Sequence, residues 1–265
     1  MAFNPNELVL ERIRSVEEYD PSTNELQGRY TQIEEPSLQT SADGTDVTDA
    51  MGAKITTFYN AQTGTFGFSN SLFSLDLAAS QFGTEKIVAS ADNKIKIPVS
   101  ETIVIGSDHT VTLKYVPVGT KGAEVKYVKV INSDNTFGKT YEVAAVAGEG
   151  KFTLDAENKK ITLPEDVTGR VFVNYTRESE AAVQVDKTTD SVPKVKSLLI
   201  HAIFRDPCET NKMFAGAIYC PRAQVDPSSV ELNLTSDGKH AVSYTLQKSY
   251  CSEDSKLFSI LVSEN

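Results

Sequence analysis

Few side chains in this sequence have the type and spacing that catalysis or metal binding requires. The histidines, His109, His201 and His240, lie far apart, and no Cys-x-x-Cys pair occurs. Because a zinc site needs ligands that converge, we interpret these histidines as isolated core or surface residues. The sequence also lacks a glycine-rich phosphate loop, a Gly-x-Ser-x-Gly elbow and a His-Glu-x-x-His motif. We therefore predict that the chain is not an enzyme and has no catalytic residues, cofactor or metal site.

Acidic side chains occur in two adjacent pairs and in one loop. The pairs are Glu17-Glu18 and Glu34-Glu35, and neighbouring residues of a strand point to opposite faces. We predict that neither pair acts on one substrate and that all four are solvated surface charges. Asp43, Asp46 and Asp49 offer oxygen ligands for Ca²⁺, but their spacing is not that of an EF-hand loop. A flexible polar loop is the preferred interpretation.

The number of cysteines indicates reduced thiols and not disulfides. Cys208, Cys220 and Cys251 are an odd number in a long chain, which speaks against a disulfide framework. If the segment between Cys208 and Cys220 is a hairpin, the two thiols would face each other across its strands. Buried thiols that behave as small apolar groups are the preferred interpretation.

Composition and charge restrict the classes of protein to which the chain can belong. The chain has 265 residues, of which 40% are hydrophobic and 23% charged, so we expect a globular protein with a core. No apolar run approaches the roughly 18 residues of a membrane span, and no secretory signal is visible, so synthesis in a cytoplasm is expected. The formal net charge of −10 argues against tight nucleic-acid binding.

The sequence pattern predicts an all-β fold, a sandwich or barrel. Apolar and polar residues alternate, with turn residues between the runs, over residues 94–99, 110–115, 170–175, 230–234 and 242–246. Residues 8–16 fit either a strand or a short helix. One short flanking α-helix is predicted over residues 69–83, with a cap at Ser69 or Ser71 and an end at Gly83. Its apolar face consists of Leu72, Leu75, Ala79 and Phe82.

The middle of the chain differs from its two ends. Residues 92–186 are dense in Lys, Val, Thr and Glu and have the length of an immunoglobulin-like module. We expect an inserted β-sandwich between a first part, residues 1–91, and a second part, residues 187–265. Residues 58–68 carry four aromatic rings around a turn and resemble a hairpin. These rings are Phe58, Tyr59, Phe66 and Phe68.

The last third carries a more specific pattern. Phe204-Arg205-Asp206 is followed by a strand that runs into Tyr219-Cys220-Pro221-Arg222-Ala223. A polar-apolar segment over residues 235–244, a Cys-containing turn and a last strand over residues 257–262 complete it. This pattern resembles the C-terminal part of phage major tail proteins, the tail tube proteins. The likeness extends in outline to residues 1–90 and covers residues 190–265, without the middle segment.

The resemblance implies a tail tube subunit in the virion, made in the host cytoplasm. Six copies would form a ring whose inner sheets join into a β-barrel, and stacked rings would enclose a lumen. Phage DNA would pass this lumen without specific binding, so we expect acidic residues to outnumber basic ones on its wall. Implied partners are further copies of the chain, tape measure, tail terminator and baseplate proteins and, in a sheathed tail, a sheath protein; no membrane is involved.

The resemblance also suggests where copies meet. Candidates for loops that link rings are Asp43, Asp46 and Asp49. The aromatic residues 58–68 would be a subunit or ring contact or, for at least half of the rings, core. Two other classes stay open. One is a capsid decoration or tail-terminator protein. The other is a carbohydrate-binding β-sandwich, although such sites often use Trp and the chain has none.

Overall fold

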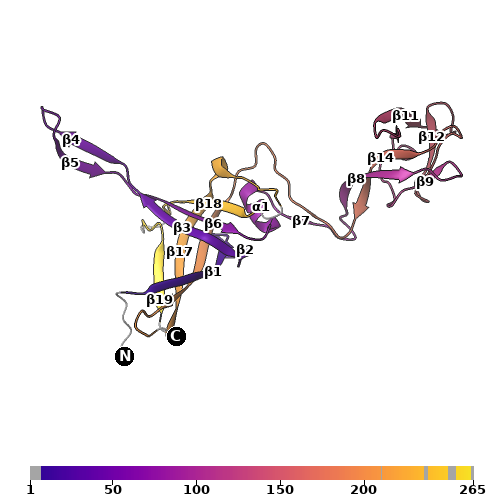
Figure 1. Cartoon of the computed structure of the whole chain (residues 1–265). Coiled ribbons are helices and arrows are strands. Elements are labelled where there is room, and N and C mark those ends of the chain that lie inside the picture. Colours follow the sequence, from indigo (N-terminus) through magenta and orange to yellow (C-terminus); the bar gives the residue numbers. More distant parts are fainter. Residues whose placement is uncertain (1–6, 210, 236–237, 250–254, 264–265) are drawn as a thin grey trace. The chain divides into compact units, whose positions relative to one another are not determined.

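A computed structural model describes residues 7–209, 211–235, 238–249 and 255–263. It is built from β-strands, one α-helix and one short 3-10 turn, which confirms the all-β class with one short helix (Figure 1). Within the described residues, no helix is long and apolar enough to cross a membrane. The chain divides into two compact units, residues 1–86 with 185–265, and residues 87–184. That the second unit is an insertion able to fold alone stays a prediction.

The first unit is organised around one large antiparallel sheet with strand order β2-β1-β16-β17-β18-β6-β3, to which β19 adds by pairing with β17. The long β17 pairs with β16 along its length, with β19 near its start and with β18 near its end. The strands and helices of this unit are β1 (Val9–Tyr19), β2 (Leu26–Tyr30), β3 (Ile33–Ser41), β4 (Gly44–Thr48), β5 (Lys54–Tyr59), β6 (Thr63–Asn70), α1 (Leu75–Phe82), β16 (Val195–Arg205), β17 (Met213–Val225), η1 (Pro227–Ser229), β18 (His240–Leu246) and β19 (Ser259–Ser263).

Alternation along β6 and β18 places every second side chain in one core, to which β1, β16 and β17 also contribute. Val16 faces Ile200 across the β1–β16 pair, and both are fully buried. The rings of Phe66 and Phe68 stack on Tyr244, with centroids 6.3 Å apart in each pair. Apolar contact of this kind is the main favourable contribution to folding. Residues 8–16, left open between strand and helix, belong to a strand.

Helix α1 is shorter than predicted and starts later. Its N-cap is Ser74, whose hydroxyl accepts a hydrogen bond from the Leu77 N–H, so the expected caps Ser69 and Ser71 are wrong. The preceding β6 extends to Asn70, and Leu72 lies exposed between the two elements. Gly83 does end the helix in the left-handed conformation with φ 72°, where a side chain would be strained.

The second unit has a core of its own, made of apolar residues from all of its longer strands. A four-stranded antiparallel group, β8-β14-β10-β11, and a three-stranded group, β12-β13-β9, are joined by a short parallel pairing of β11 with β12. The immunoglobulin-like interpretation stays a prediction. The strands are β7 (Ile87–Val88), β8 (Ile95–Val104), β9 (Thr110–Thr112), β10 (Tyr127–Ile131), β11 (Phe137–Val143), β12 (Lys151–Asp155), β13 (Lys160–Thr162), β14 (Arg170–Ser179) and β15 (Val183–Gln184).

One predicted strand is wrong. Residues 230–234 alternate as a strand would but form none, and Leu234 is 86% exposed. Asp226 and Pro227 begin a 3-10 turn just before this segment, and the Asn233 side chain caps a turn at Thr235. Alternation alone does not make a strand when no neighbouring strand is available for pairing.

Candidate functional site

The hairpin of β4 and β5 forms a two-stranded sheet separate from the large one (Figure 1). Almost all of its side chains are exposed, including apolar ones. Met51 is 94% exposed at its turn, and Ile55, Phe58 and Tyr59 on β5 are each more than 60% exposed. Single exposed apolar residues are common, but several on one hairpin indicate a contact surface.

The three aspartates of the predicted loop lie on or beside this hairpin and stabilise it individually. The Asp46 carboxylate lies 2.8 Å from the Lys54 Nζ and accepts a hydrogen bond from Thr57, and these contacts lower its pKa. Asp49 accepts hydrogen bonds from two N–H groups of the β4–β5 turn. The backbone carbonyl of Asp43 accepts a hydrogen bond from the Asn60 N–H at the base of the hairpin. The segment predicted to be a flexible loop is therefore mostly strand.

The four aromatic rings of residues 58–68 fall into two groups. Phe66 and Phe68 on β6 are buried, as expected for half of the rings, whereas Phe58 and Tyr59 on β5 are exposed. The predicted hairpin of these residues is wrong, because β5 pairs with β4 while β6 pairs with β3 and β18. Phe66 and Phe68 stack on Tyr244 where β6 pairs with β18. Residues 60–62 connect the β4–β5 sheet to the large sheet.

The large sheet has unpaired edges. Strand β1 pairs with β16 from Val9 onwards but with β2 only from Val16, so residues 9–15 have no second strand partner among the described residues. Strand β19 pairs with β17 on one side, and no described strand pairs with its other side. Leu10 and Leu261 are each more than half exposed at these edges. Unpaired N–H and C=O groups of an edge are a template for another strand.

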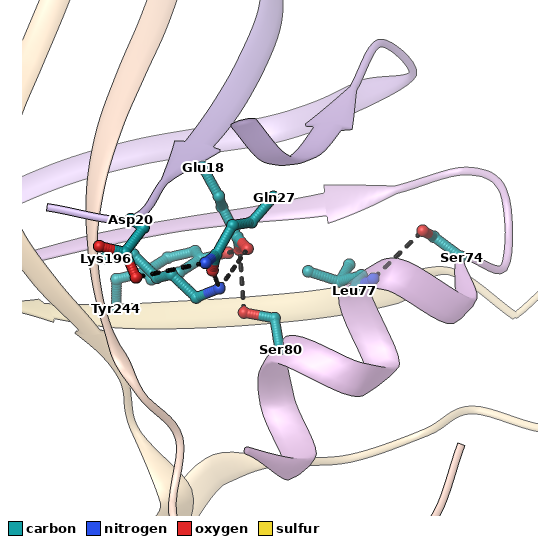
Figure 2. A network of polar contacts seen from close by, with 8 residues as sticks. All are labelled: Glu18, Asp20, Gln27, Ser74, Leu77, Ser80, Lys196 and Tyr244. Carbon is teal, nitrogen blue, oxygen red and sulfur yellow. Dashed lines mark hydrogen bonds and ion pairs between the residues drawn. The ribbon is translucent and has the colours of Figure 1, made fainter. Parts of the chain in front are cut away.

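A buried polar network lies beneath helix α1 (Figure 2). Glu18 on β1 is 1% exposed, and its carboxylate accepts hydrogen bonds from the hydroxyls of Tyr244 on β18 and, at 3.1 Å, Ser80 on α1. The Lys196 Nζ on β16 lies 4.0 Å from Glu18 and donates to the side-chain oxygen of Gln27 on β2. One carboxylate therefore ties three strands to the helix.

Burial shifts the ionisation of both charged groups in this network. It raises the pKa of Glu18, although Tyr244, Lys196 and Ser80 oppose the rise. It also lowers the pKa of Lys196, against the attraction of Glu18. The prediction that Glu17 and Glu18 are solvated surface charges is wrong, because Glu17 is 9% and Glu18 1% exposed. The prediction that they point to opposite faces is confirmed by their different partners.

A second buried pair holds the helix onto the sheet. The His240 Nε2 lies 2.7 Å from the Gln81 Oε1, and its Nδ1 accepts a hydrogen bond from the Ser74 N–H. Gln81 in turn donates to the carbonyl of Ala241 on β18. Burial lowers the pKa of His240, which favours the neutral ring. His240 is a core histidine, as predicted from its isolation.

The opposite face of the sheet holds a smaller ionic cluster. Glu17 lies 3.2 Å from the Arg29 Nε and 3.3 Å from the His201 Nε2, and it accepts a hydrogen bond from Tyr19. Burial alone would raise the pKa of Glu17, but the hydrogen bonds from Tyr19 and His201 and the nearby positive charges lower it. These groups border a hollow of about 330 Å³ that Arg14 also lines.

The remaining candidate residues do not converge. His109 lies in the second unit, away from the other histidines in the sequence, and no group of three metal-ligating side chains occurs within the described ranges. Cys220 is buried on β17 and Cys208 is exposed in the preceding loop, so the two thiols do not pair. Burial raises the pKa of Cys220 to about 12, as expected for an inert core thiol. Cys251 lies outside the described residues.

The chain is thus a β-protein whose large sheet has edges open to further strands. The family model described as the YomU/Tube protein family matches residues 8–256. The chain belongs to this family, which confirms the resemblance to phage tail tube proteins and identifies a structural protein of the virion. No curated protein matches the chain.

Proposed function

We propose that this chain is the major subunit of a phage tail tube, in which rings of six copies stack around a lumen that phage DNA passes. Membership of the tube family supports self-assembly into a tube. The observation that carries the proposal is that the large sheet has unpaired edges of different kinds in one subunit, among them residues 9–15 and β19; β2 and β3, at the ends of the strand order, are also paired on one side only. Different complementary edges associate head to tail, and head-to-tail contacts that close generate rings.

In this proposal, β19 of one copy pairs with residues 9–15 of the next. Backbone hydrogen bonds give the contact its geometry, and the exposed Leu261 and Leu10 are buried beside them. The sequence of β19, Ser-Ile-Leu-Val-Ser, contains no charge and no proline, the residues with which natural edge strands prevent association.

The β4–β5 hairpin then links successive rings. Its exposed Met51, Phe58 and Tyr59 supply apolar contact with a neighbouring ring, since nothing described in their own chain covers them. The Asp46–Lys54 pair and the Asp49 turn hold the hairpin in shape. Asp43, Asp46 and Asp49 thus support a stacking element, and Phe66 and Phe68 anchor the sheet from which it departs.

The charges on a face of the sheet bear on whether that face lines the lumen. Repulsion of DNA phosphates requires more acidic than basic groups on the wall. The open face of the large sheet carries Arg14 and Arg29 beside Glu17. If this face lined the lumen, the acidic groups would have to come from other elements. Tape measure, tail terminator, baseplate and sheath proteins remain the proposed partners.

Two variants separate ring closure from stacking. Leu261→Lys places a charge on the β19 edge, and we expect it to leave mostly monomers in light scattering, instead of particles of about six times 28.9 kDa. The double variant Phe58→Ser, Tyr59→Ser should keep the rings but shorten or abolish tubes in negative-stain electron microscopy. Leu234→Lys, at an 86% exposed position that belongs to neither β19 nor the β4–β5 hairpin, is the matched control.

The opposite pattern would contradict the proposal. If Leu261→Lys forms rings and tubes as readily as Leu234→Lys, β19 is not the closing edge. A chain that stays monomeric under all conditions but binds assembled capsids or finished tails would instead be a decoration or terminator protein.

A further inference from the structure

The second unit contains a polar hollow that no part of the tube proposal uses. Its volume is about 470 Å³, within the roughly 300–1,000 Å³ range of small-molecule sites. Its lining includes Gly119, Glu124, Lys126, Tyr127, Asn174 and Thr176. All of these residues belong to the second unit, so the hollow is a feature of that unit alone.

Two elements bring these side chains together. Val128 on β10 lies opposite Val173 on β14, which places the preceding Tyr127 and the following Asn174 on the same face of the sheet. The loop before β10 is fixed against β14 by a hydrogen bond from the Val118 N–H to the carbonyl of Thr176. The rim of the hollow is therefore anchored to the sheet at both sides.

The polar groups of this hollow have unused hydrogen-bonding capacity. The Oε2 of Glu124 is buried, and no described group donates a hydrogen bond to it. A buried oxygen without a hydrogen-bond donor destabilises the fold, and more so if it is charged. Gly119 packs closely against the backbone of Glu124, since a Cβ at position 119 would lie 3.3 Å from the Glu124 Cα. Lys126 and Asn174 also line the hollow, and both are exposed, so their side chains are accessible to a ligand.

The combination of groups selects a class of ligand. The Tyr127 ring is 55% exposed and offers a flat apolar surface, on which the C–H face of a pyranose ring can stack. A carboxylate accepts hydrogen bonds from hydroxyls, and an amide both donates and accepts them. Glu124 and Lys126 carry opposite charges, so the hollow has no net attraction for an anion or a cation. These properties suit a neutral polyhydroxyl ligand.

We propose that the second unit binds a neutral saccharide in this hollow. Tyr127 supplies the stacking surface, and Glu124 and Asn174 hold the hydroxyls of the sugar. The proposal does not depend on ring formation, and it would hold for a monomer as well as for a tube.

The test is saturation-transfer difference NMR on the full-length protein, a method that tolerates large assemblies. The probes are tetrasaccharides of glucose, galactose and N-acetylglucosamine, with sialyllactose as a charged comparison. We expect at least one neutral probe to bind. Glu124→Gln, Asn174→Ala and Tyr127→Ala should each weaken that binding on the order of tenfold, the equivalent of about 1.4 kcal/mol. Glu157→Gln, at an exposed position outside the hollow, should bind like the wild type.

Thermal melts establish that each variant is folded before it is compared. The proposal is overturned if no neutral probe binds at about 10 mM, a concentration that detects even millimolar affinity. It is equally overturned if all three variants bind as the wild type does, or if sialyllactose alone binds.

Discussion

The two units of this chain differ in the edge strands of their sheets. In the first unit, β19 is an uncharged edge strand without proline, and residues 9–15 of β1 lack a second strand partner among the described residues. The edge strand β3 of the same sheet, in contrast, carries Glu34, Glu35 and Pro36. In the second unit, the edge strand β8 carries Pro98 and Lys96, and the opposite edge, β9, has only three residues. Proline, charge and shortness all discourage edge-to-edge association. The β19 edge of the first unit is therefore open to a further strand, whereas β3 and both edges of the second unit are protected against one.

The units also differ in what they bury. The core of the first contains Glu18 and Lys196 in one hydrogen-bonded network, and the core of the second is formed by apolar side chains and tyrosines. Buried ionic groups contribute little net stability but strongly penalise any arrangement that separates them. We infer that the network fixes how helix α1 and strands β1, β16 and β18 fit together. The position of the open edge of β1 depends on this arrangement of the helix and strands.

The largest effect should come from a cavity in the second unit. Phe152 on β12 is fully buried, and Phe152→Ala should destabilise this unit by about 3–5 kcal/mol. Because the open edges belong to the other unit, tube or ring formation should persist below the melting temperature of the variant. Differential scanning calorimetry with light scattering measures both. Loss of assembly at a temperature where the first unit remains folded would show that the two units are not independent.

A comparable effect is expected from separating the buried ion pair. Glu18→Leu leaves Lys196 without its carboxylate and should cost about 3 kcal/mol or more. The double variant Glu18→Leu, Lys196→Met should cost less than the sum of the two single changes, measured by urea denaturation. Strict additivity would mean that the two side chains do not interact.

The pH dependence of the first unit offers a gentler test. Since burial raises the pKa of Glu18, the folded chain retains a proton that the unfolded chain releases above its ordinary pKa of 4.5. Stability from this group is therefore complete below that pH and decreases as the pH rises toward the folded pKa. Relative to Glu18→Gln, the wild type should lose stability as the pH rises above 4.5. Parallel pH profiles of the two proteins would contradict the raised pKa.

The smallest predicted effect concerns the cap of helix α1. Ser74→Ala removes the hydroxyl that accepts from the Leu77 N–H and should cost about 1 kcal/mol. The exposed Ser22→Ala in the β1–β2 turn is a suitable comparison, because there Asp20 supplies the capping carboxylate. Equal stability of Ser74→Ala and Ser22→Ala would show that the Ser74 cap does not stabilise the helix.

Local patterns were sufficient for much of the fold. Alternation identified the strands around Val99, Val173 and Tyr244 because each has a neighbouring strand and one buried face. Gly83 was identified as the end of the helix because the left-handed conformation is a local property. The same alternation failed at residues 230–234, because pairing depends on a partner elsewhere in the chain.

The candidate surfaces were less predictable. Asp43, Asp46 and Asp49 were found together on one element, but the division of the aromatic residues between two sheets depends on long-range pairing with β18. Glu18 was missed because adjacent glutamates usually lie at the surface. Its burial requires Tyr244, Ser80 and Lys196, which come from three distant parts of the sequence. A glutamate within a run that is otherwise strand-like is the only local signal.

The most direct test of the central claim is negative-stain electron microscopy of the purified wild-type protein, with light scattering on the same sample. The account predicts tubes, or rings with a mass of about six times 28.9 kDa. It also predicts that Leu261→Lys reduces them to monomers under the same conditions. A wild type that forms tubes while Leu261→Lys forms them equally well would contradict the claim that the open edge of β19 closes the ring.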